Sequence, residues 1–285
     1  MAAIREIKSR ITATKKTSQI TNAMYMVSAS KLKKAERSIV SYRPLLKRMN
    51  HIIRGILSAK DVNHPMLEKR NDKMTCYILV SSDRGLAGPH NANVFRQFQK
   101  AISERKDEKF VVAAIGQKAF NFARRNKYDL IQEKAIHVRD DIQFVDFVDI
   151  TQTFISLYLK EEIDRIVVFY SHFINTISQT VEQVQLLPIE FAEADETEKQ
   201  TSYIYEPNQQ QIINDLLPMF VENQLYGFIL EAKASEHASR MTAMKSATDN
   251  AKDIIKKLEL HYNRARQQAI TIELTDIIGG ANAVN

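Results

Sequence analysis

The fold is decided by one stretch near the N-terminus, which runs from Ile4 to Ile56 and reads IREIKSRITATKKTSQITNAMYMVSASKLKKAERSIVSYRPLLKRMNHIIRGI. Steps of three and four residues alternate along it without a slip. A period of 3.5 residues held over so many turns is typical of a coiled-coil helix. We call this stripe the N-terminal seam. Its members are Ile4, Ile7, Ile11, Thr14, Ser18, Thr21, Tyr25, Ser28, Leu32, Ala35, Ile39, Tyr42, Leu46, Met49, Ile53 and Ile56.

The C-terminal segment has the same character, because no glycine or proline interrupts it from Phe228 to Ile278. We expect the helix to begin near Asn208, and we expect Gly279 and Gly280 to end it. Pro218 is expected to bend this helix and Gly227 to loosen it. Its predicted stripe is Ala234, Ala238, Met241, Met244, Ala247, Ala251, Ile254, Leu258, Tyr262, Ala265, Ala269 and Ile272.

Each helix would be roughly 75–105 Å long at about 1.5 Å per residue, which exceeds the diameter of a small domain. Neither helix is apolar all round, so each needs a partner for one stripe. Because a compact middle separates them in sequence, we predict that they pair with each other. The alternative is that each pairs with a second copy in a homodimer, as in a basic-region zipper. The basic residues here are interleaved with the heptads, which argues against that class.

The middle of the chain predicts a small domain with a mostly parallel sheet, because buried strand patterns alternate with helical ones. The predicted strands are Met74–Ser81, Phe110–Ile115, Ile166–Tyr170 and, at an edge, Thr180–Leu187. Residues 60–73 are read as a hinge and residues 192–202 as a polar loop. The fold class is therefore α/β, with an antiparallel coiled coil of the terminal helices and a central Rossmann-like domain. The predicted parts are 1–59, 74–190 and 208–278, the last pairing with the first.

Charge is distributed unevenly. Residues 1–59 hold thirteen Lys or Arg and two acids, a net of +11, whereas the remaining residues hold 27 basic and 32 acidic side chains. A basic arm indicates an anionic partner, which could be nucleic acid, a lipid surface or an acidic protein.

Composition excludes several classes of protein. The single cysteine, Cys76, excludes a disulfide framework and a cysteine-rich metal site, and its place in a predicted strand indicates a buried, inert thiol. No run of eighteen apolar residues is present, so no membrane span is predicted. The seven histidines show no metal-ligand spacing.

One turn lies where ligands bind in doubly wound sheets. Ser81–Pro89 (SSDRGLAGP) follows the first predicted strand and precedes a helix, and Gly85 and Gly88 would let backbone amides approach a phosphate. It matches neither GxGxxG nor a P-loop. The simpler interpretation is a structural turn in which Asp83 is a cap and Arg84 its partner.

Four separated motifs resemble the gamma subunit of the F-type ATP synthase. They are Ile20–Leu32 (ITNAMYMVSASKL), Ser81–Leu86 (SSDRGL), Glu236–Ala251 (EHASRMTAMKSATDNA), and Tyr262–Thr271 (YNRARQQAIT) with Glu273–Thr275 and Gly279–Ala281. The resemblance covers the whole chain in order. It implies the non-catalytic central shaft of the enzyme, which holds no cofactor or metal and couples proton-driven rotation to ATP synthesis at the beta subunits.

The resemblance also implies partners and contact residues. The partners are the ring of three alpha and three beta subunits, the epsilon subunit and the membrane ring of c subunits, and nucleic acid is not among them. Met24 and Arg240 would face a lever of beta, and Arg266 and Gln267 a contact higher in the ring. Tyr203, Tyr205 and Glu206 would form the foot on the rotor ring. From charge alone, Lys31, Lys33 and Lys34 would share a lower electrostatic contact.

The chain departs from some relatives. Ala87 stands where many have cysteine, and no insert with paired cysteines is present, so thiol regulation is not expected. The chain begins with charged, periodic sequence, which predicts no transit peptide and thus a bacterial protein, peripheral to the cell membrane on its cytoplasmic side. Two alternatives remain open: a coiled-coil nucleic-acid-binding protein that uses the basic arm, and a small α/β enzyme that uses the turn at Gly85–Gly88.

Overall fold

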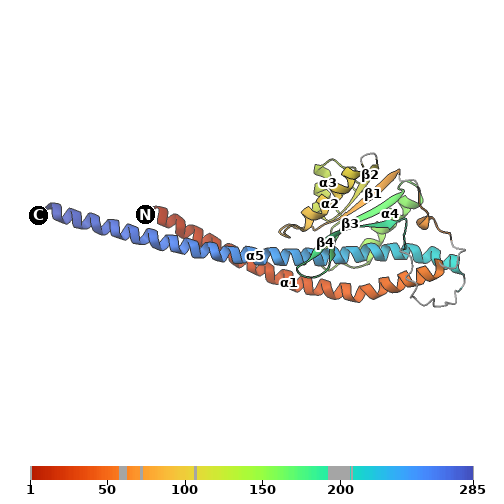
Figure 1. Ribbon diagram of the computed structural model, residues 1–285, viewed down its shortest axis with the longest axis horizontal. Coiled ribbons are helices and arrows are strands. Elements are labelled where there is room, and N and C mark those ends of the chain that lie inside the picture. The colour runs from red at the N-terminus through yellow and green to blue at the C-terminus, as the bar shows by residue number, and fades with distance from the viewer. Residues whose placement is uncertain are drawn as a thin grey trace. The chain divides into compact units, whose positions relative to one another are not determined.

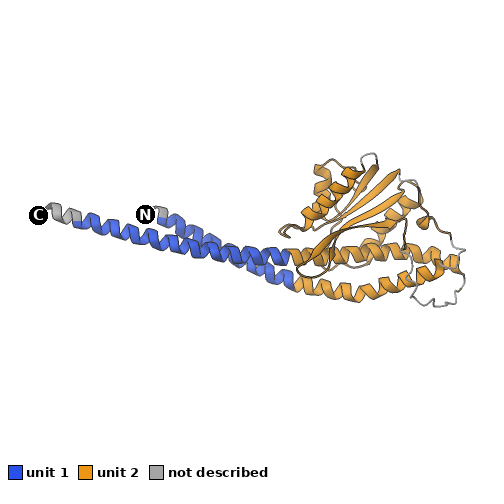
Figure 2. Ribbon diagram, viewed as in Figure 1, with its two compact units in different colours: residues 1–29, 240–285 blue, residues 30–239 orange. Residues whose placement is uncertain are grey.

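Two compact units make up the chain (Figure 2). One contains residues 1–29 and 240–285, and the other contains residues 30–239. The computed structural model describes residues 2–57, 63–70, 73–105, 108–191, 206 and 208–284. Two long helices, α1 (Ala2–Leu57) and α5 (Gln209–Val284), contribute a segment to each unit. We call the two units the terminal unit and the sheet unit.

The sheet unit is built on four strands: β1 (Met74–Val80), β2 (Lys109–Ile115), β3 (Arg165–Phe173) and β4 (Gln179–Leu187). Their order is β2-β1-β3-β4 (Figure 1). β1 pairs in parallel with β2 and with β3, and β4 lies antiparallel to β3 at the edge. The mostly parallel sheet predicted from the sequence is therefore confirmed.

Helices α2 (His90–Glu104) and α3 (Gln117–Arg125) cover one face of this sheet. Tyr77 and Phe98 lie at the centre of that core and are at most 1% exposed. On the other face the α5 segment of this unit packs against β3. The rings of Tyr170 and Phe228 stack at 4.5 Å, and Ser235 Oγ donates to the Ser171 carbonyl. The sheet is thus covered on both faces, as a largely parallel sheet requires.

The sequence patterns did not identify α3. Its nine residues form because Gly116, at the end of β2, turns the chain with φ 95° and a short apolar stripe follows. A helix of two to three turns gives little periodic signal, so the buried residues Ala119, Phe120 and Ala123 were not recognised as one face. Two further elements complete the unit, namely α4 (Val145–Leu159) and the 3₁₀ turn η1 (Pro65–Leu67) within the predicted hinge.

In the terminal unit the two helical segments run antiparallel side by side (Figure 1). Lys15 Nζ lies 2.8 Å from Glu259 Oε1, and the hydroxyls of Thr21 and Thr248 are 2.7 Å apart. The Lys245 ammonium lies 5.6 Å from the centre of the Tyr25 ring. Every position of the N-terminal seam is buried or half-buried, so that stripe is confirmed, and α1 continues as one helix through Pro44.

The predicted C-terminal stripe was wrong at Ile254, which is 49% exposed, while the neighbouring Ile255 is half-buried. Ala247 is half-buried, and the adjacent Thr248, which the predicted stripe did not include, is more deeply buried, with 3% exposed. A threonine is tolerated there because its hydroxyl donates to the Met244 carbonyl at 2.8 Å and also contacts Thr21.

The predicted helix end at Gly279 and Gly280 was also wrong, because α5 continues to Val284. Glycine lowers helix stability by about 1 kcal/mol relative to alanine but keeps its N–H donor, so it does not by itself end a helix. Ile272, which was placed in the stripe, is 54% exposed. Because Lys15 pairs with Glu259 in an antiparallel arrangement, the first described turn of α1 lies beside residues near Ala269 of α5. The described α5 residues after Ala269 therefore have no described α1 residue opposite them.

Gly116→Ala is expected to lower the free energy of unfolding by about 2–4 kcal/mol, because a Cβ at φ 95° would lie 2.2 Å from the Ser81 carbonyl oxygen. Gly85→Ala is the matched control, since its nearest neighbour would be Lys118 Cε at 3.9 Å. Urea unfolding followed by circular dichroism measures both. Equal stability of the two variants would contradict this account of the turn.

Cys76 is expected to resist thiol reagents in the folded chain. Its side chain is fully buried in β1, and burial raises the pKa of the thiol far above its usual range. A chromogenic disulfide reagent should react with this thiol only as fast as the chain unfolds, and reaction should be complete in denaturant. Rapid labelling under native conditions would show that β1 is not a buried strand.

Candidate partner-contact surfaces

The predicted contact residues of the terminal unit differ in accessibility. Met24 is half-buried beside the seam, and its carbonyl accepts from Ser28 Oγ at 2.7 Å. Arg240 is buried, with 9% exposed, whereas Arg266 and Gln267 are exposed on α5. The side chains of Arg266 and Gln267 are therefore accessible on this chain, while Arg240 exposes only a small part of its surface.

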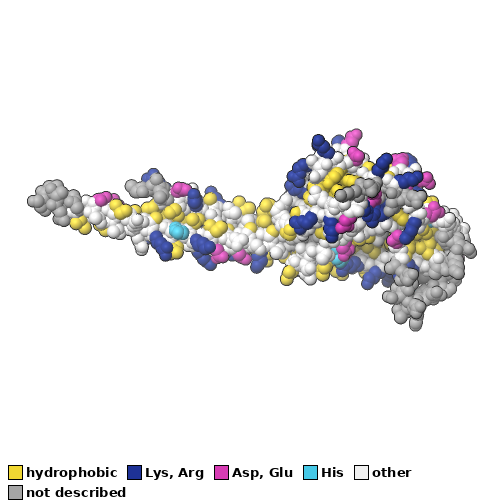
Figure 3. All heavy atoms as spheres, turned by 45° about the horizontal axis from the view of Figure 1, so that its top comes forward, with side chains coloured by type: hydrophobic (Ala, Val, Ile, Leu, Met, Phe, Trp, Pro, Cys, Tyr) yellow, Lys and Arg dark blue, Asp and Glu magenta, His cyan; other side chains and the backbone are white. Residues whose placement is uncertain are grey.

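The distal part of α5 carries an apolar surface that the sequence analysis had not singled out. No residue from 270 to 278 is buried, and these residues include five large aliphatic side chains. They are Ile270, Ile272, Leu274, Ile277 and Ile278, with exposed fractions between 48% and 62%. Hydrophobic side chains are visible on the surface of this unit in Figure 3. Such a concentration on an exposed helix indicates a binding partner.

The three predicted lysines of the sheet unit do not form one group. Lys31 Nζ lies 2.5 Å from Asp140 Oδ2, while Lys33 and Lys34 are exposed. Glu206 is exposed in a bend, and Tyr203 and Tyr205 lie outside the described residues. Part of the positive charge of α1 is thus matched within the chain, which weakens the case for a continuous basic surface.

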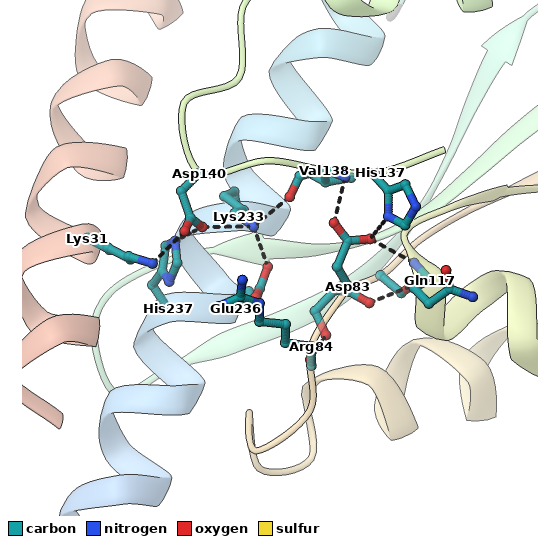
Figure 4. A network of polar contacts seen from close by, with 12 residues as sticks. Lys31, Asp83, Arg84, Gln117, His137, Val138, Asp140, Lys233, Glu236 and His237 are labelled. Carbon is teal, nitrogen blue, oxygen red and sulfur yellow. Dashed lines mark hydrogen bonds and ion pairs between the residues drawn. The ribbon is translucent and has the colours of Figure 1, made fainter. Parts of the chain in front are cut away.

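Lys31 belongs to a polar group that links the loop of residues 137–144 to both long helices (Figure 4). We call Lys31, Asp140, Lys233, Glu236 and His237 the Asp140 cluster. Lys233 Nζ lies 3.1 Å from Asp140 Oδ1 and 3.1 Å from Glu236 Oε2, and it donates to the Val138 carbonyl at 2.9 Å. His237 Nε2 lies 3.3 Å from Asp140 Oδ1.

Two members of the cluster are almost fully buried, so their pairing contributes most to its stability. The side chains of Lys233 and Glu236 are 7% and 6% exposed, and a buried charge is tolerated only when it is paired and hydrogen-bonded. Partial burial alone would raise the pKa of Asp140. The hydrogen bond from Lys31 and the charges of Lys233 and His237 outweigh that effect and hold this pKa below its usual range.

Only a weak sign of this cluster is visible in the sequence. Lys233 stands between Ala232 and Ala234, so a lysine lies among small buried residues and needs an acid. Asp140 could not be identified as that acid, because it is far away in sequence and belongs to a loop with no periodic pattern. The cluster appears only once the loop and the helices are placed in three dimensions.

The turn at Ser81–Pro89 has a structural role. Asp83 accepts hydrogen bonds from the backbone amides of Gln117 and Val138, each at 2.9 Å, and lies 3.3 Å from His137 Nδ1 (Figure 4). Asp83 is therefore a cap, as expected, but of α3 rather than of the helix that follows the turn. Its carboxylate already supplies the negative charge that the start of α3 favours.

Several histidines contact groups of the same chain. His64 Nδ1 accepts from the Met66 amide at 3.2 Å and caps η1, and burial lowers the pKa of this histidine. His172 contacts Glu231, and His237 belongs to the Asp140 cluster. Within the described ranges, no group of three or more His, Cys, Asp or Glu side chains is placed to hold a metal ion.

Two comparisons establish the family. A family model described as ATP synthase matches residues 3–284. A relative from Macrococcus caseolyticus (strain JCSC5402), named ATP synthase gamma chain, is 44% identical over 288 residues that span the whole of both chains. The chain belongs to the ATP synthase gamma chain family. The motifs that suggested this resemblance therefore identified the family correctly.

The fold of this gamma chain family member also matches solved structures. Two come from Euglena gracilis mitochondrial ATP synthase: a rotor, with a TM-score of 0.67 and 18% identity, and an OSCP/F1/c-ring structure, with 0.70 and 17%. They cover 94% and 99% of this chain, and 99% and 95% of theirs is matched. A Tetrahymena thermophila mitochondrial ATP synthase central stalk/c-ring chain has a TM-score of 0.58, 23% identity, and coverages of 80% and 99%.

At such low identities these likenesses concern the fold alone. They support the fold over most or all of the chain. They agree with a mostly parallel sheet flanked by helical ends. Among the described residues, no helix combines the length and apolar character needed to cross a bilayer.

Lys233→Met is expected to lower the free energy of unfolding by about 3 kcal/mol or more, because it leaves two carboxylates without their buried cation. Lys252→Met is the control: Lys252 forms a similarly spaced pair with Asp249 on α5, but both side chains are about 60% exposed, and the cost should stay below about 1 kcal/mol. Chemical denaturation compares them. Similar losses would show that the burial of Lys233 contributes nothing special.

Proposed function

We propose that this chain is the central rotating shaft of an F-type ATP synthase, coupling rotation of a membrane ring to ATP synthesis or hydrolysis in a surrounding ring of alpha and beta subunits. The observation that carries the proposal is the full-length match to gamma chains, at 44% identity, on a chain whose two ends form one antiparallel helix pair. In this proposal the chain is not catalytic, and the chemistry belongs to its partners.

The terminal unit has the properties that a shaft inside a collar needs. Its buried positions include small side chains such as Ser28, Thr248 and Ala251, so the two helices approach closely and the pair stays narrow. Two helices joined along a seam resist bending and twisting better than one. Beyond the paired turns, the five aliphatic side chains of 270–278, which lie beside the exposed acids Glu273 and Asp276, would turn against apolar walls of the collar.

The predicted contacts become specific parts of this proposal. Met24 and Arg240 would face the moving lever of beta, and Arg266 and Gln267 the upper part of the collar. Lys33 and Lys34 are exposed and would meet acidic groups of beta with attraction that depends on the rotation angle. Tyr203, Tyr205 and Glu206 would form the foot on the ring of c subunits, next to the epsilon subunit, at the cytoplasmic face of a bacterial membrane.

Nucleic-acid binding has no observation in its favour. Lys15, Lys31 and Arg43 each pair with an acid of the same chain, so the basic arm is less positive in the fold than in the sequence. Full-length family membership further removes the reason to prefer that reading.

The proposal is tested by producing this chain together with the alpha and beta subunits of the same organism. We expect one complex in which this chain is present once per three alpha and three beta subunits, with ATPase activity that is lost when the chain is omitted. A complex that assembles and hydrolyses ATP equally well without it would refute the shaft proposal. Recovery of bound nucleic acid instead would favour the discarded alternative.

Met24→Lys is expected to reduce proton pumping per ATP hydrolysed by about two- to tenfold, since one unfavourable contact of roughly 0.5–1.4 kcal/mol changes a population by that factor. The thermal stability of the isolated chain should change little, because Met24 is only half-buried. Met24→Leu is the control, because it keeps the volume and adds no charge.

Proton pumping is measured in vesicles that contain the reassembled enzyme, alongside ATP hydrolysis in the same preparation. An unchanged ratio for Met24→Lys would mean that this position does not face a partner. An equal loss in Met24→Leu would point to packing within the seam rather than to charge.

A further inference from the structure

The loop of residues 137–144 is held by both long helices at one carboxylate. Within the sheet unit, Lys31 comes from α1, whereas Lys233 and His237 come from α5, and all three converge on Asp140 (Figure 4). The distances are 2.5, 3.1 and 3.3 Å respectively. Asp140 lies outside the strands and the apolar core, so its contacts connect elements rather than build the sheet.

Two further anchors make this loop a continuous link to the sheet. At its start, the Val138 amide donates to Asp83, which follows β1, and the Val138 carbonyl accepts from Lys233. Near its end, the Tyr226 hydroxyl donates to the Ile142 carbonyl at 3.1 Å. Polar contacts therefore run without a break from the carboxyl end of β1, through the loop, to α5 and α1.

We propose that Asp140 is a positioning residue for torque transfer, which holds the 137–144 loop to α1 and α5 so that the sheet region turns together with both helices. This inference rests on the proposed shaft function. It assigns Lys31 to a contact inside the chain, whereas Lys33 and Lys34 remain available to partners. If α1 and α5 turned relative to the sheet region, part of the rotation applied at the foot would not reach the collar.

The arrangement suits a joint better than a single ion pair would. Lys233 is 7% exposed and cannot leave the carboxylates without carrying its charge into an apolar environment, so its pairing is persistent. Lys31 is 38% exposed and adds the second helix to the same carboxylate. Because Asp140 accepts from both, its loss should release α1 and weaken the hold of α5 in one step.

The first test is hydrogen exchange of the 137–144 amides in the full chain. The variants are Asp140→Asn, Lys31→Gln and the double variant. Each single change should speed exchange about two- to fivefold, the range expected for a partly exposed ion pair, and the double variant should be no faster than Asp140→Asn. Lys34→Gln is the matched control and should leave this loop unchanged, while Lys31→Arg should retain its protection.

The second test measures proton pumping per ATP hydrolysed in the reassembled enzyme. Asp140→Asn and Lys31→Gln should each lower the ratio, and Lys31→Gln should have no further effect once Asp140 is Asn. Any effect of Lys34→Gln should instead add to that of Asp140→Asn, because Lys34 would act on a partner. Thermal unfolding of the isolated variants checks that the loss does not follow from unfolding.

The outcomes separate this inference from the shaft proposal. Unchanged loop exchange in Asp140→Asn, or full additivity of Lys31→Gln with Asp140→Asn, would overturn the joint. Faster exchange together with an unaltered pumping ratio would overturn its role in torque transfer. If the wild-type chain gave no functional enzyme with alpha and beta subunits, the shaft proposal itself would fail, although the exchange results would still report on the contact.

Discussion

The packing of α1 against α5 is the contact on which the rest of the structure depends. A long amphipathic helix in water gains most of its stability from covering its apolar stripe, and neither of these helices has a second element along the terminal unit. The stripe is narrow and rich in alanine, serine and threonine, so each residue contributes little burial. Stability must come from length and from close approach, including the Thr21–Thr248 contact inside the seam.

The ion pairs of the terminal unit and those of the sheet unit differ in burial. The side chains of the Lys15–Glu259 pair are about half exposed, and such a pair contributes little to the free energy of unfolding. The Asp140 cluster is deeper and joins three elements, so each ion depends on the others. In the shaft proposal the sheet region and the helix segments packed on it turn together, and separating the buried charges of this cluster would oppose their movement against each other.

Periodicity made much of this fold predictable. The N-terminal seam was correct at every position, because its pattern repeats over many turns. The four strands were found to within a few residues, because each is a short, largely apolar run bounded by polar segments. The failures have local causes. Thr248 was left out of the predicted stripe, but its hydroxyl is satisfied by the Met244 carbonyl and the residue is buried. Gly279 was expected to end α5, but glycine keeps its N–H donor and the helix continues to Val284.

The contact residues were harder to predict. Lys31 was grouped with Lys33 and Lys34 by charge, but its carboxylate partner comes from a loop more than a hundred residues away. Lys233 was overlooked because a lysine among alanines looks like an ordinary helix residue. Met24, Arg266 and Gln267 came from family resemblance, and their partners are other chains, so neither the sequence nor one chain's fold tests them.

Direct observation of rotation tests the central claim most directly. A label on Lys109→Cys, exposed at the start of β2, would follow this chain in a complex with immobilised alpha and beta subunits, because Cys76 is buried and should not react. The account predicts stepwise rotation in one direction with three equivalent stops per turn while ATP is hydrolysed. A label that stays still, or only fluctuates, during full ATP hydrolysis would contradict it.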